Sequence, residues 1–276
     1  MIKWIKINVM IDTQETPPFF MGSMLRGAFG FALKRIVCIN PSYKCEGCFT
    51  AKECVYYTFY EEQNVFHKFR LDIGIQQKNF DFSLYLFEDA IDSLPYVLSA
   101  IKKAVEEEGL GKDRKTMAIK QMSVSNQIVY DGNDFQSLKA ITANSLQIDS
   151  YCPDVEIVFT MPLRIKENNK FARESIALHT LINNIHSRYR QLKGDPPARM
   201  DYRVEGKIVL STLKFVEMQR YSGRQKKGMN MGGLKGTMTI KGLDPKSYEY
   251  LKIGEVIGAG KQTVFGLGSY KIKEQK

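Results

Sequence analysis

Four cysteines stand in one short segment of the chain, CINPSYKCEGCFTAKEC. They are Cys38, Cys45, Cys48 and Cys54. Four thiolates with an inner C-x2-C pair and a turn residue at Gly47 are able to close a tetrahedral site around a structural zinc ion. The outer spacings of six and five residues differ from those of the commonest zinc ribbons. Two other interpretations stay open, a reduced set of packing thiols and an iron–sulfur cluster, and the remaining Cys152 is expected in the core.

A second candidate site lies in RESIALHTLINNIHSRYRQLKG, which has the pattern of an amphipathic helix from about residue 173 to 193. Its apolar stripe is formed by Leu178, Leu181, Ile185, Tyr189 and Leu192. A polar stripe runs beside it at the same spacing, formed by His179, Asn183, His186 and Arg190. Imidazoles titrate near neutrality, so this stripe is suited to proton transfer beside a phosphate. The alternative is a solvated helix face on which the histidines are incidental. The third histidine, His67, is expected to be structural or on the surface.

Charge indicates the class of partner. The chain has 40 Lys and Arg against 30 Asp and Glu, a formal charge of +10 and a pI near 9.2, which favours a polyanion such as nucleic acid or an anionic membrane surface. Basic residues gather in QRYSGRQKKGMNMGGLKG, which has the composition of a flexible hairpin end with Tyr221 for stacking. Its cations are Arg220, Arg224, Lys226, Lys227 and Lys235. Arg26, Lys34 and Arg35 in the first expected helix could extend the same anion-binding track. An ordinary exposed hairpin is the alternative.

The glycine-rich segment GAGKQTVFGLGSYKI, residues 258–272, resembles nucleotide loops only superficially. Its spacing fits neither a P-loop nor a dinucleotide fingerprint, so no nucleotide cofactor is expected. Two interpretations remain. One is a loop whose bare backbone amides lie beside the cation of Lys261, and the other is a helix-to-strand turn that needs positive φ angles.

The elements that position these segments follow one order in each half. The first half offers a strand at 2–11, a helix at 23–37, extended segments at 55–60, 67–76 and 80–87, a helix at 91–108 and a strand at 121–130. The second half, from DVEIVFTMPLRI onward, repeats the order β-α-β-β-α-β, so the chain divides near residue 150 into domains 1–150 and 151–276. No segment has the length of a membrane span or the features of a signal peptide, which predicts a cytoplasmic protein with reduced thiols.

Three segments together resemble a known family. SMLRGAFGFALKR followed by the cysteines, YSGRQKKGMNMGGLKGTMTIKG, and GEVIGAGKQTVFGLGSYKI are similar to the repeat-processing endoribonucleases of CRISPR systems, in the RAMP superfamily. The most specific element is the G-x-G-x5-G-x-G pattern of Gly258, Gly260, Gly266 and Gly268. The resemblance implies an α+β fold of two tandem ferredoxin-like (βαββαβ) domains, with a cysteine-rich loop inserted in the first.

The resemblance also implies a reaction. Members of the family cut CRISPR precursor RNA without a metal, by attack of a ribose 2′-hydroxyl on the adjacent phosphate, which leaves a 2′,3′-cyclic phosphate and a 5′-hydroxyl. The partner would then be CRISPR repeat RNA. The alternative is a non-catalytic RAMP subunit that binds guide RNA together with other CRISPR-associated proteins in an effector complex. A zinc-dependent enzyme is disfavoured because a closed four-cysteine site leaves no position for substrate.

Many members carry a histidine in or just after the first helix, whereas this chain has none between Met1 and Phe66. The catalytic residues are therefore expected to be His186 and His179 with Arg190, and next Tyr43. The residues expected to contact RNA are Arg26, Lys34, Arg220, Arg224, Lys226, Lys227, Lys235, Gly258, Gly260, Lys261, Gly266 and Gly268.

Overall fold

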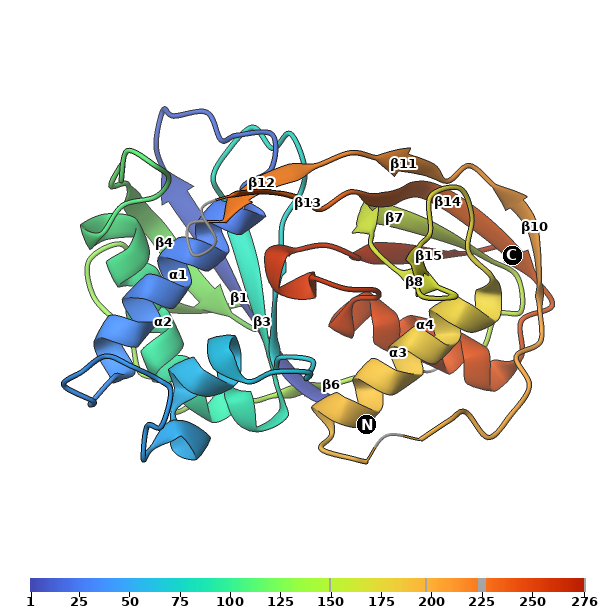
Figure 1. Cartoon of the computed structure of the whole chain (residues 1–276), viewed down its shortest axis with the longest axis horizontal. Coiled ribbons are helices and arrows are strands. Elements are labelled where there is room, and N and C mark those ends of the chain that lie inside the picture. The colour runs from blue at the N-terminus through green and yellow to red at the C-terminus, as the bar shows by residue number, and fades with distance from the viewer. Residues whose placement is uncertain (149, 197, 223–226, 276) are drawn as a thin grey trace. The chain divides into compact units, whose positions relative to one another are not determined.

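The structure is a computed structural model that describes residues 1–148, 150–196, 198–222 and 227–275 (Figure 1). The chain divides into two compact units, Lys3–Ser145 and Leu146–Lys276. Met1 groups with the first unit and Ile2 with the second. Within the described ranges, no helix combines the length and the apolar character needed to cross a bilayer.

The first unit is an antiparallel sheet with two main helices. Its strands are β1 (Lys3–Asp12), β2 (Phe69–Asp72), β3 (Phe82–Phe87), β4 (Ala118–Val124), β5 (Gln127–Tyr130) and β6 (Asn144–Ser145), and its helices are α1 (Gly22–Val37) and α2 (Leu94–Lys102). The strands lie in the order β2-β3-β1-β4-β5, with β6 also paired to β1. Short helical turns at Ala51–Glu53, Tyr57–Glu61, Glu88–Ser93 and Lys103–Glu107 complete the unit.

Period-two and helical patterns explain this unit. Ile5, Ile7 and Val9 of β1 are buried on one face because alternate side chains of a strand point the same way. Leu25 and Phe29 of α1 recur four residues apart and are likewise buried. Helices α1 and α2 lie side by side and pack against each other (Figure 1).

The second unit has the same kind of architecture. Its strands are β7 (Val155–Leu163), β8 (Lys166–Glu167), β9 (Lys170–Phe171), β10 (Lys207–Ser211), β11 (Lys214–Val216), β12 (Gln219–Ser222), β13 (Lys227–Asn230), β14 (Gly233–Lys241) and β15 (Tyr270–Glu274). Its helices are α3 (Leu178–Leu192) and α4 (Pro245–Ile257), with a short turn at Thr263–Phe265. The main sheet has the order β10-β14-β7-β15, β11 pairs with β14, and two ribbons, β8–β9 and β12–β13, stand apart from it.

Each unit therefore contains β-α-β-β-α-β in chain order, with the four strands arranged second, third, first and fourth across the sheet. The mixture of helices and strands expected from the sequence is confirmed, and the strand pairs of both main sheets are antiparallel. The segment GKIVLSTLKFVEMQRY, whose residue pattern predicts one long strand, instead forms three strands, β10, β11 and β12. An irregularity in the pairing of β10 with β14 between Ile208 and Leu210 marks where this edge begins to break.

The prediction of an extended segment at residues 55–60 is also wrong. Tyr57–Glu61 forms a π-helical turn. It buries Phe59, whose ring stacks on Phe69 with centroids 4.8 Å apart, and its Tyr60 hydroxyl donates to the carbonyl oxygen of Arg26 over 2.7 Å. Aromatic packing against α1 and β2 has overridden the strand preference of the aromatic residues.

Candidate functional site

A surface hollow in the first unit gathers cations and aromatic rings. It is lined by Phe31, Lys34, Arg35, Tyr43 and Lys103, and its volume is about 520 Å³. Helix α1 supplies the first three residues near its C-terminal end, the loop after α1 supplies Tyr43, and the turn after α2 supplies Lys103. This volume lies within the range of ~300–1,000 Å³ that is usual for sites of small ligands. Among the described residues, none that lines the hollow is acidic or a histidine.

The cations of the hollow are held by neighbours without being buried. Arg35 lies over the ring of Phe31, 4.5 Å from its centroid, and its guanidinium pairs with Glu108 over 2.6 Å. Lys103 pairs with Glu107 over 2.6 Å, and Lys34 lies 4.8 Å from the ring centroid of Tyr56. These contacts orient the side chains while leaving their charges at the surface.

Two aromatic side chains of the hollow are open to solvent. Tyr43 is 49% exposed and Phe31 is 42% exposed. Tyr43 has a positive φ of 54°, and its N–H donates to the carbonyl oxygen of Asn40 over 2.9 Å. Exposed rings beside cations are the combination that binds bases and phosphates of a single-stranded nucleic acid. The structure thus brings Tyr43 and Lys34, which the sequence singled out separately, to one place.

Arg26 does not belong to this surface. Its guanidinium lies 4.5 Å from the ring centroid of Tyr60, between α1 and the following helical turn. Burial lowers the pKa of Arg26 and raises the pKa of Tyr60. The sequence could not distinguish Arg26 from Lys34 because both stand on the same helix.

In the second unit, the predicted polar stripe of α3 does not form one exposed face. His179 is exposed, but His186 is buried, with 6% of its surface exposed, and its ring meets that of Tyr250 edge-on with centroids 5.3 Å apart. Burial and, after it, the charge of Arg190 lower the pKa of His186. Arg190 itself donates through Nε to the carbonyl oxygen of Pro196 over 3.1 Å. The prediction of a shared imidazole face is wrong because the packed side of α3 is wider than the predicted apolar stripe.

Two other residues of α3 were missed, and both hold the glycine-rich segment. Asn184 accepts a hydrogen bond from the N–H of Gly260 through Oδ1 over 2.6 Å. Arg188, which is 3% exposed, donates through Nη1 to the hydroxyl of Thr263 over 2.8 Å and through Nη2 to the carbonyl oxygen of Gly260. One signal was available in the sequence, since Arg188 falls on the apolar spacing between Ile185 and Leu192.

The amides of the glycine-rich segment are not bare, so the first of the two interpretations of this segment is wrong. The N–H of Lys261 donates to the carbonyl oxygen of Arg164 over 2.7 Å, and that of Gly268 to the carbonyl oxygen of Pro162 over 3.0 Å. The N–H groups of Gly258 and Gly266 are also bonded within the chain, to Gly254 and Thr263. The four glycines are buried, whereas the Lys261 side chain is exposed.

The close approach that these glycines permit is to the protein's own backbone. Gly268 has φ +72°, and a Cβ there would overlap the carbonyl oxygen of Ala259. Gly260 has φ +76°, and a Cβ there would lie 2.6 Å from the carbonyl oxygen of Arg164. Both positions therefore require glycine for conformation and for space. The interpretation as a turn with positive φ angles is confirmed.

The basic hairpin is described only in part. Arg224 and Lys226 lie outside the described residues, and for Lys227 only the backbone pairing of β13 with β12 is given. The guanidinium of Arg220 lies 4.8 Å from the ring centroid of Phe265. Phe265 belongs to the short turn Thr263–Phe265, which follows Gly258 and Gly260 in the glycine-rich segment. Lys235 is partly exposed on β14. The sequence did not predict that Arg220 contacts the glycine-rich segment.

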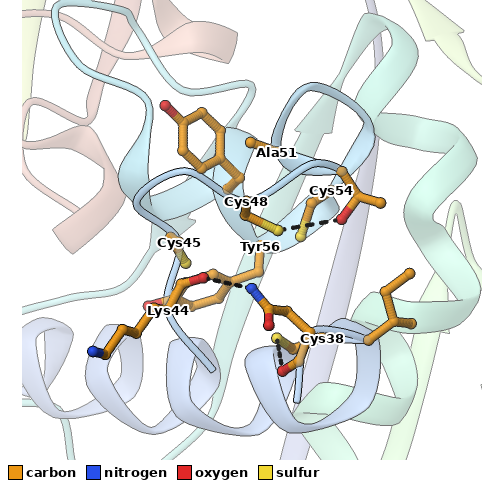
Figure 2. A pocket seen from close by; sticks show the side chains of 11 residues that line it. Cys38, Lys44, Cys45, Cys48, Ala51, Cys54 and Tyr56 are labelled. Carbon is orange, nitrogen blue, oxygen red and sulfur yellow. Dashed lines mark hydrogen bonds between the residues drawn. The ribbon is translucent and has the colours of Figure 1, made fainter. Parts of the chain in front are cut away.

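The four clustered cysteines line one pocket of the first unit (Figure 2). All are free and partly exposed. The Cys48 thiol lies 3.5 Å from the hydroxyl of Thr50, and this hydrogen bond lowers the pKa of Cys48. Within the described part of the chain, no three His, Cys, Asp or Glu side chains are close enough together to hold a metal ion. The donor set suits zinc, but the sulfur positions do not form its tetrahedron, so the zinc site stays a prediction. Cys152, expected in the core, is half-buried.

The comparison with known families agrees with the two units. Residues 2–143 match the family model AF_1859_N, described as an N-terminal domain, and this match spans more than half of the chain. The chain belongs to the AF_1859_N family. Residues 157–270 match the model of the CRISPR-associated endoribonuclease Cas6. The resemblance to CRISPR-associated endoribonucleases of the RAMP superfamily is thereby confirmed.

Relatives of this AF_1859_N family member extend over its whole length. An uncharacterized protein of Archaeoglobus fulgidus is 23% identical over 294 residues, which cover 98% of the chain and 96% of that protein. Cas6 of Thermus thermophilus has a TM-score of 0.57 at 11% identity, with 99% and 98% of the two chains covered. The product of a Cas6-related gene of Pyrococcus furiosus has a TM-score of 0.55 at 14% identity, with both chains fully covered. At these identities the two structures show a Cas6-like fold.

Proposed function

We propose that this protein binds the repeat RNA of CRISPR precursor transcripts and cleaves it. The Cas6 family match supports a CRISPR-associated role in RNA binding or processing. The observation that carries the proposal to particular residues is the hollow of the first unit, where three cations and two exposed rings meet. We assign the two units to tandem ferredoxin-like RAMP domains, 1–150 and 151–276, on the strand order that both share. The proposed location is the cytoplasm.

RNA binding at the hollow follows from the chemistry of its lining. Lys34, Arg35 and Lys103 neutralise phosphates, and Tyr43 and Phe31 offer ring faces on which bases stack. Lys34 and Lys103 act as point charges, whereas the planar guanidinium of Arg35 can hold two phosphate oxygens at once. Because stacking and charge are both tolerant of base identity, this hollow would supply affinity, and other contacts would supply the choice of repeat.

The proposed cleavage is attack of the 2′-hydroxyl on the adjacent phosphate. The hydroxyl loses its proton to a base, the 5′-oxygen leaves with a proton from an acid, and cations stabilise the phosphorane between them. The products are a 2′,3′-cyclic phosphate and a 5′-hydroxyl, and no metal is required for this chemistry. Tyr43 and the lysines of the hollow are the lining groups that are able to exchange a proton.

A modified RNA tests the reaction directly. A repeat RNA with one 2′-deoxy sugar just upstream of the scissile phosphate should bind normally and resist cleavage, and excess EDTA should leave the rate nearly unchanged. Tyr43→Phe should lower the rate by about a hundredfold while affinity changes only a few-fold. Tyr96→Phe is the matched control, because Tyr96 is equally exposed on α2 and does not line the hollow. Cleavage of the deoxy-substituted RNA would exclude the mechanism.

The cleavage rates of two histidine variants decide whether the proton is transferred by residues of the hollow or by histidines of α3. If His186 or His179 transfers the proton, with Arg190 beside it, replacement by Ala should cost about a hundredfold in rate. Full activity of both variants would assign the proton transfer to the hollow. Buried His186 needs an unfolding control, because the loss of its packing against Tyr250 lowers the amount of folded protein.

One observation favours a second function, a non-catalytic subunit that holds guide RNA. Among the described residues no histidine lines the hollow, and His186 is buried. In that case the protein would bind repeat RNA with the same salt dependence and leave every repeat RNA intact. It would act together with other CRISPR-associated proteins in an effector complex. Binding without cyclic-phosphate product, measured over a panel of repeat RNAs, identifies this function.

A further inference from the structure

We propose that Cys38, Cys45, Cys48 and Cys54 together bind one zinc ion, and that this ion orders the loop that carries Tyr43. The proposal concerns a structural site and does not depend on RNA cleavage. The four thiols line one pocket (Figure 2), where Cys38 lies on one side, Cys45 on another, and Cys48 and Cys54 on a third. The four ligands therefore approach the same space from three sides.

The backbone of the loop brings the cysteines together by short turns. The N–H of Cys48 donates to the carbonyl oxygen of Cys45 over 3.2 Å, with Gly47 at φ +69° inside this turn. Two more turns follow, from Cys48 to Ala51 over 3.2 Å and from Ala51 to Cys54 over 3.3 Å. Cys38 is anchored at the end of α1, where its N–H donates to the carbonyl oxygen of Lys34 over 3.0 Å. The coil from Cys45 to Cys54 is thus compact, and Cys38 faces it from a fixed helix end.

Beyond its hydrogen-bonded turns, the loop has little hydrophobic packing to hold it. Of residues 38–54, all of which the structure describes, none is buried. Ile39 is 69% exposed and Phe49 is 81% exposed, so even its large apolar side chains lie outside the core. A segment of this length without a fully buried side chain gains little hydrophobic stabilisation to offset the conformational entropy lost on ordering. Metal–thiolate bonds supply such stabilisation in small motifs.

The sulfur atoms have to draw together to bind the ion. In the described residues they do not form a metal-binding group, while zinc requires four Zn–S bonds of about 2.3 Å. Rotation about side-chain bonds and small shifts of the exposed coil allow this, because no buried packing holds the coil in place. The all-sulfur donor set selects a soft or borderline ion such as Zn²⁺ over Mg²⁺ or Ca²⁺. As the four thiols become thiolates, their protons pass to solvent, and the exposed Lys44 beside the pocket offsets part of the resulting negative charge.

Zinc binding has a consequence for the hollow. Tyr43 and Lys44 stand between Cys38 and Cys45, so the ion would fix both ends of the short stretch that presents Tyr43. The site would be a positioning device for this side chain, and a closed four-thiolate sphere would leave no place for a substrate.

Metal analysis of the purified protein is the first test. Protein prepared without chelators and then supplied with zinc should hold about one zinc per chain after desalting. The Cys45→Ser/Cys48→Ser variant should lose it, and the Cys152→Ser variant should retain it, because Cys152 lies outside the cluster. Cobalt in place of zinc should give the visible absorption of tetrahedral thiolate coordination. Metal-free wild-type protein, zinc retained by the double variant, or disulfides among the four cysteines would each overturn the proposal.

Limited trypsin digestion measures the order of the loop in the wild-type protein. Because no variant is needed, the result does not depend on whether a variant folds. Lys44 and Lys52 are exposed within the loop, and Lys139 is exposed in another loop of the same unit. Removal of the metal should speed cleavage after Lys44 and Lys52 about tenfold or more, because cleavage follows the population of the open loop. Cleavage after Lys139 should keep its rate. Equal rates at all three lysines with and without metal would contradict the ordering of the loop.

Discussion

The guanidinium of Arg188 reaches from α3 to the carbonyl oxygen of Gly260. The same side chain bonds to Thr263, and Asn184, one helical turn earlier, accepts the N–H of Gly260. Both hydrogen-bonding groups of Gly260 are therefore held by one helix face. The glycine-rich segment is therefore fixed in part by two polar residues of α3.

Replacement of Arg188 should destabilise the second unit. Arg188→Met keeps the length of the side chain but leaves the carbonyl of Gly260 and the hydroxyl of Thr263 without their donor. A loss of about 3 kcal/mol in the free energy of unfolding is expected, as for buried hydrogen bonds to charged groups. Arg190→Met is the control, since this residue is more exposed and its described side-chain hydrogen bond goes to the carbonyl oxygen of Pro196. Urea unfolding followed by circular dichroism should show the larger loss for Arg188, and equal losses would contradict the role assigned to it.

Alanine variants of two glycines distinguish the energetic cost of a left-handed backbone from the cost of steric overlap. Gly194 has φ +79°, and a Cβ there would have no neighbouring atom within 4 Å, so Gly194→Ala should cost about 1 kcal/mol for the left-handed backbone alone. Gly268→Ala adds overlap with the backbone of Ala259, and a total of at least about 3 kcal/mol is expected. Thermal unfolding of both variants measures the difference. If Gly268→Ala is as stable as Gly194→Ala, the packing of these two backbone segments is not as described.

Acid should weaken the second unit through His186. Because burial lowers the pKa of this imidazole in the folded state, the unfolded chain takes up a proton at a higher pH than the folded chain does. The contribution of neutral His186 to the free energy of unfolding is complete above the pKa of about 6.5 that the imidazole has in the unfolded chain. This contribution is lost as the pH falls through the lower pKa of the folded state. His186→Phe removes the titration, so its melting temperature should fall less than that of wild type between about pH 7.5 and pH 5.5. An unchanged pH dependence would show that His186 is not the titrating group; His179→Phe, at an exposed position, is the control.

RNA affinity should depend on salt through the hollow. Replacement of Lys34, Arg35 and Lys103 by Gln should make the slope of log affinity against log salt shallower by about 2, since each neutralised phosphate of a single strand contributes about 0.7. The control replaces Lys207, Lys241 and Lys271, which are exposed on the second unit. Filter binding or fluorescence anisotropy at several salt concentrations gives the slope. The same slope in both triple variants would mean that RNA does not contact the hollow.

Local patterns predicted much of the fold. The helix at 23–37 was correct to within one residue of α1, and the β-α-β-β-α-β order appears in both units, because period-two and period-3.6 spacing are set by nearby residues. The turn at Tyr57–Glu61 was not predictable in this way, since its conformation depends on Phe69 and Arg26.

The candidate site was harder to predict than the fold. Tyr43 and Lys34 were recognised individually, but Lys103 joins them only through the packing of α2 and the turn after it against α1. Arg188 was overlooked because Tyr189 fits an apolar stripe better, although the neighbouring arginine is the one that the fold buries. Distances between elements, rather than residue types, decided each of these positions.

The central position of β7 also bears on how quickly the second unit reaches its native state. Thr160 of β7 bonds to the carbonyl oxygen of Ser269 beside β15, and these residues are 109 positions apart in the chain. The ends of a long segment must meet before this pairing contributes any enthalpy, so the entropy of loop closure is lost first. The sheet of the second unit should accordingly assemble late and slowly, with α3 and the β12–β13 ribbon able to form earlier from local contacts.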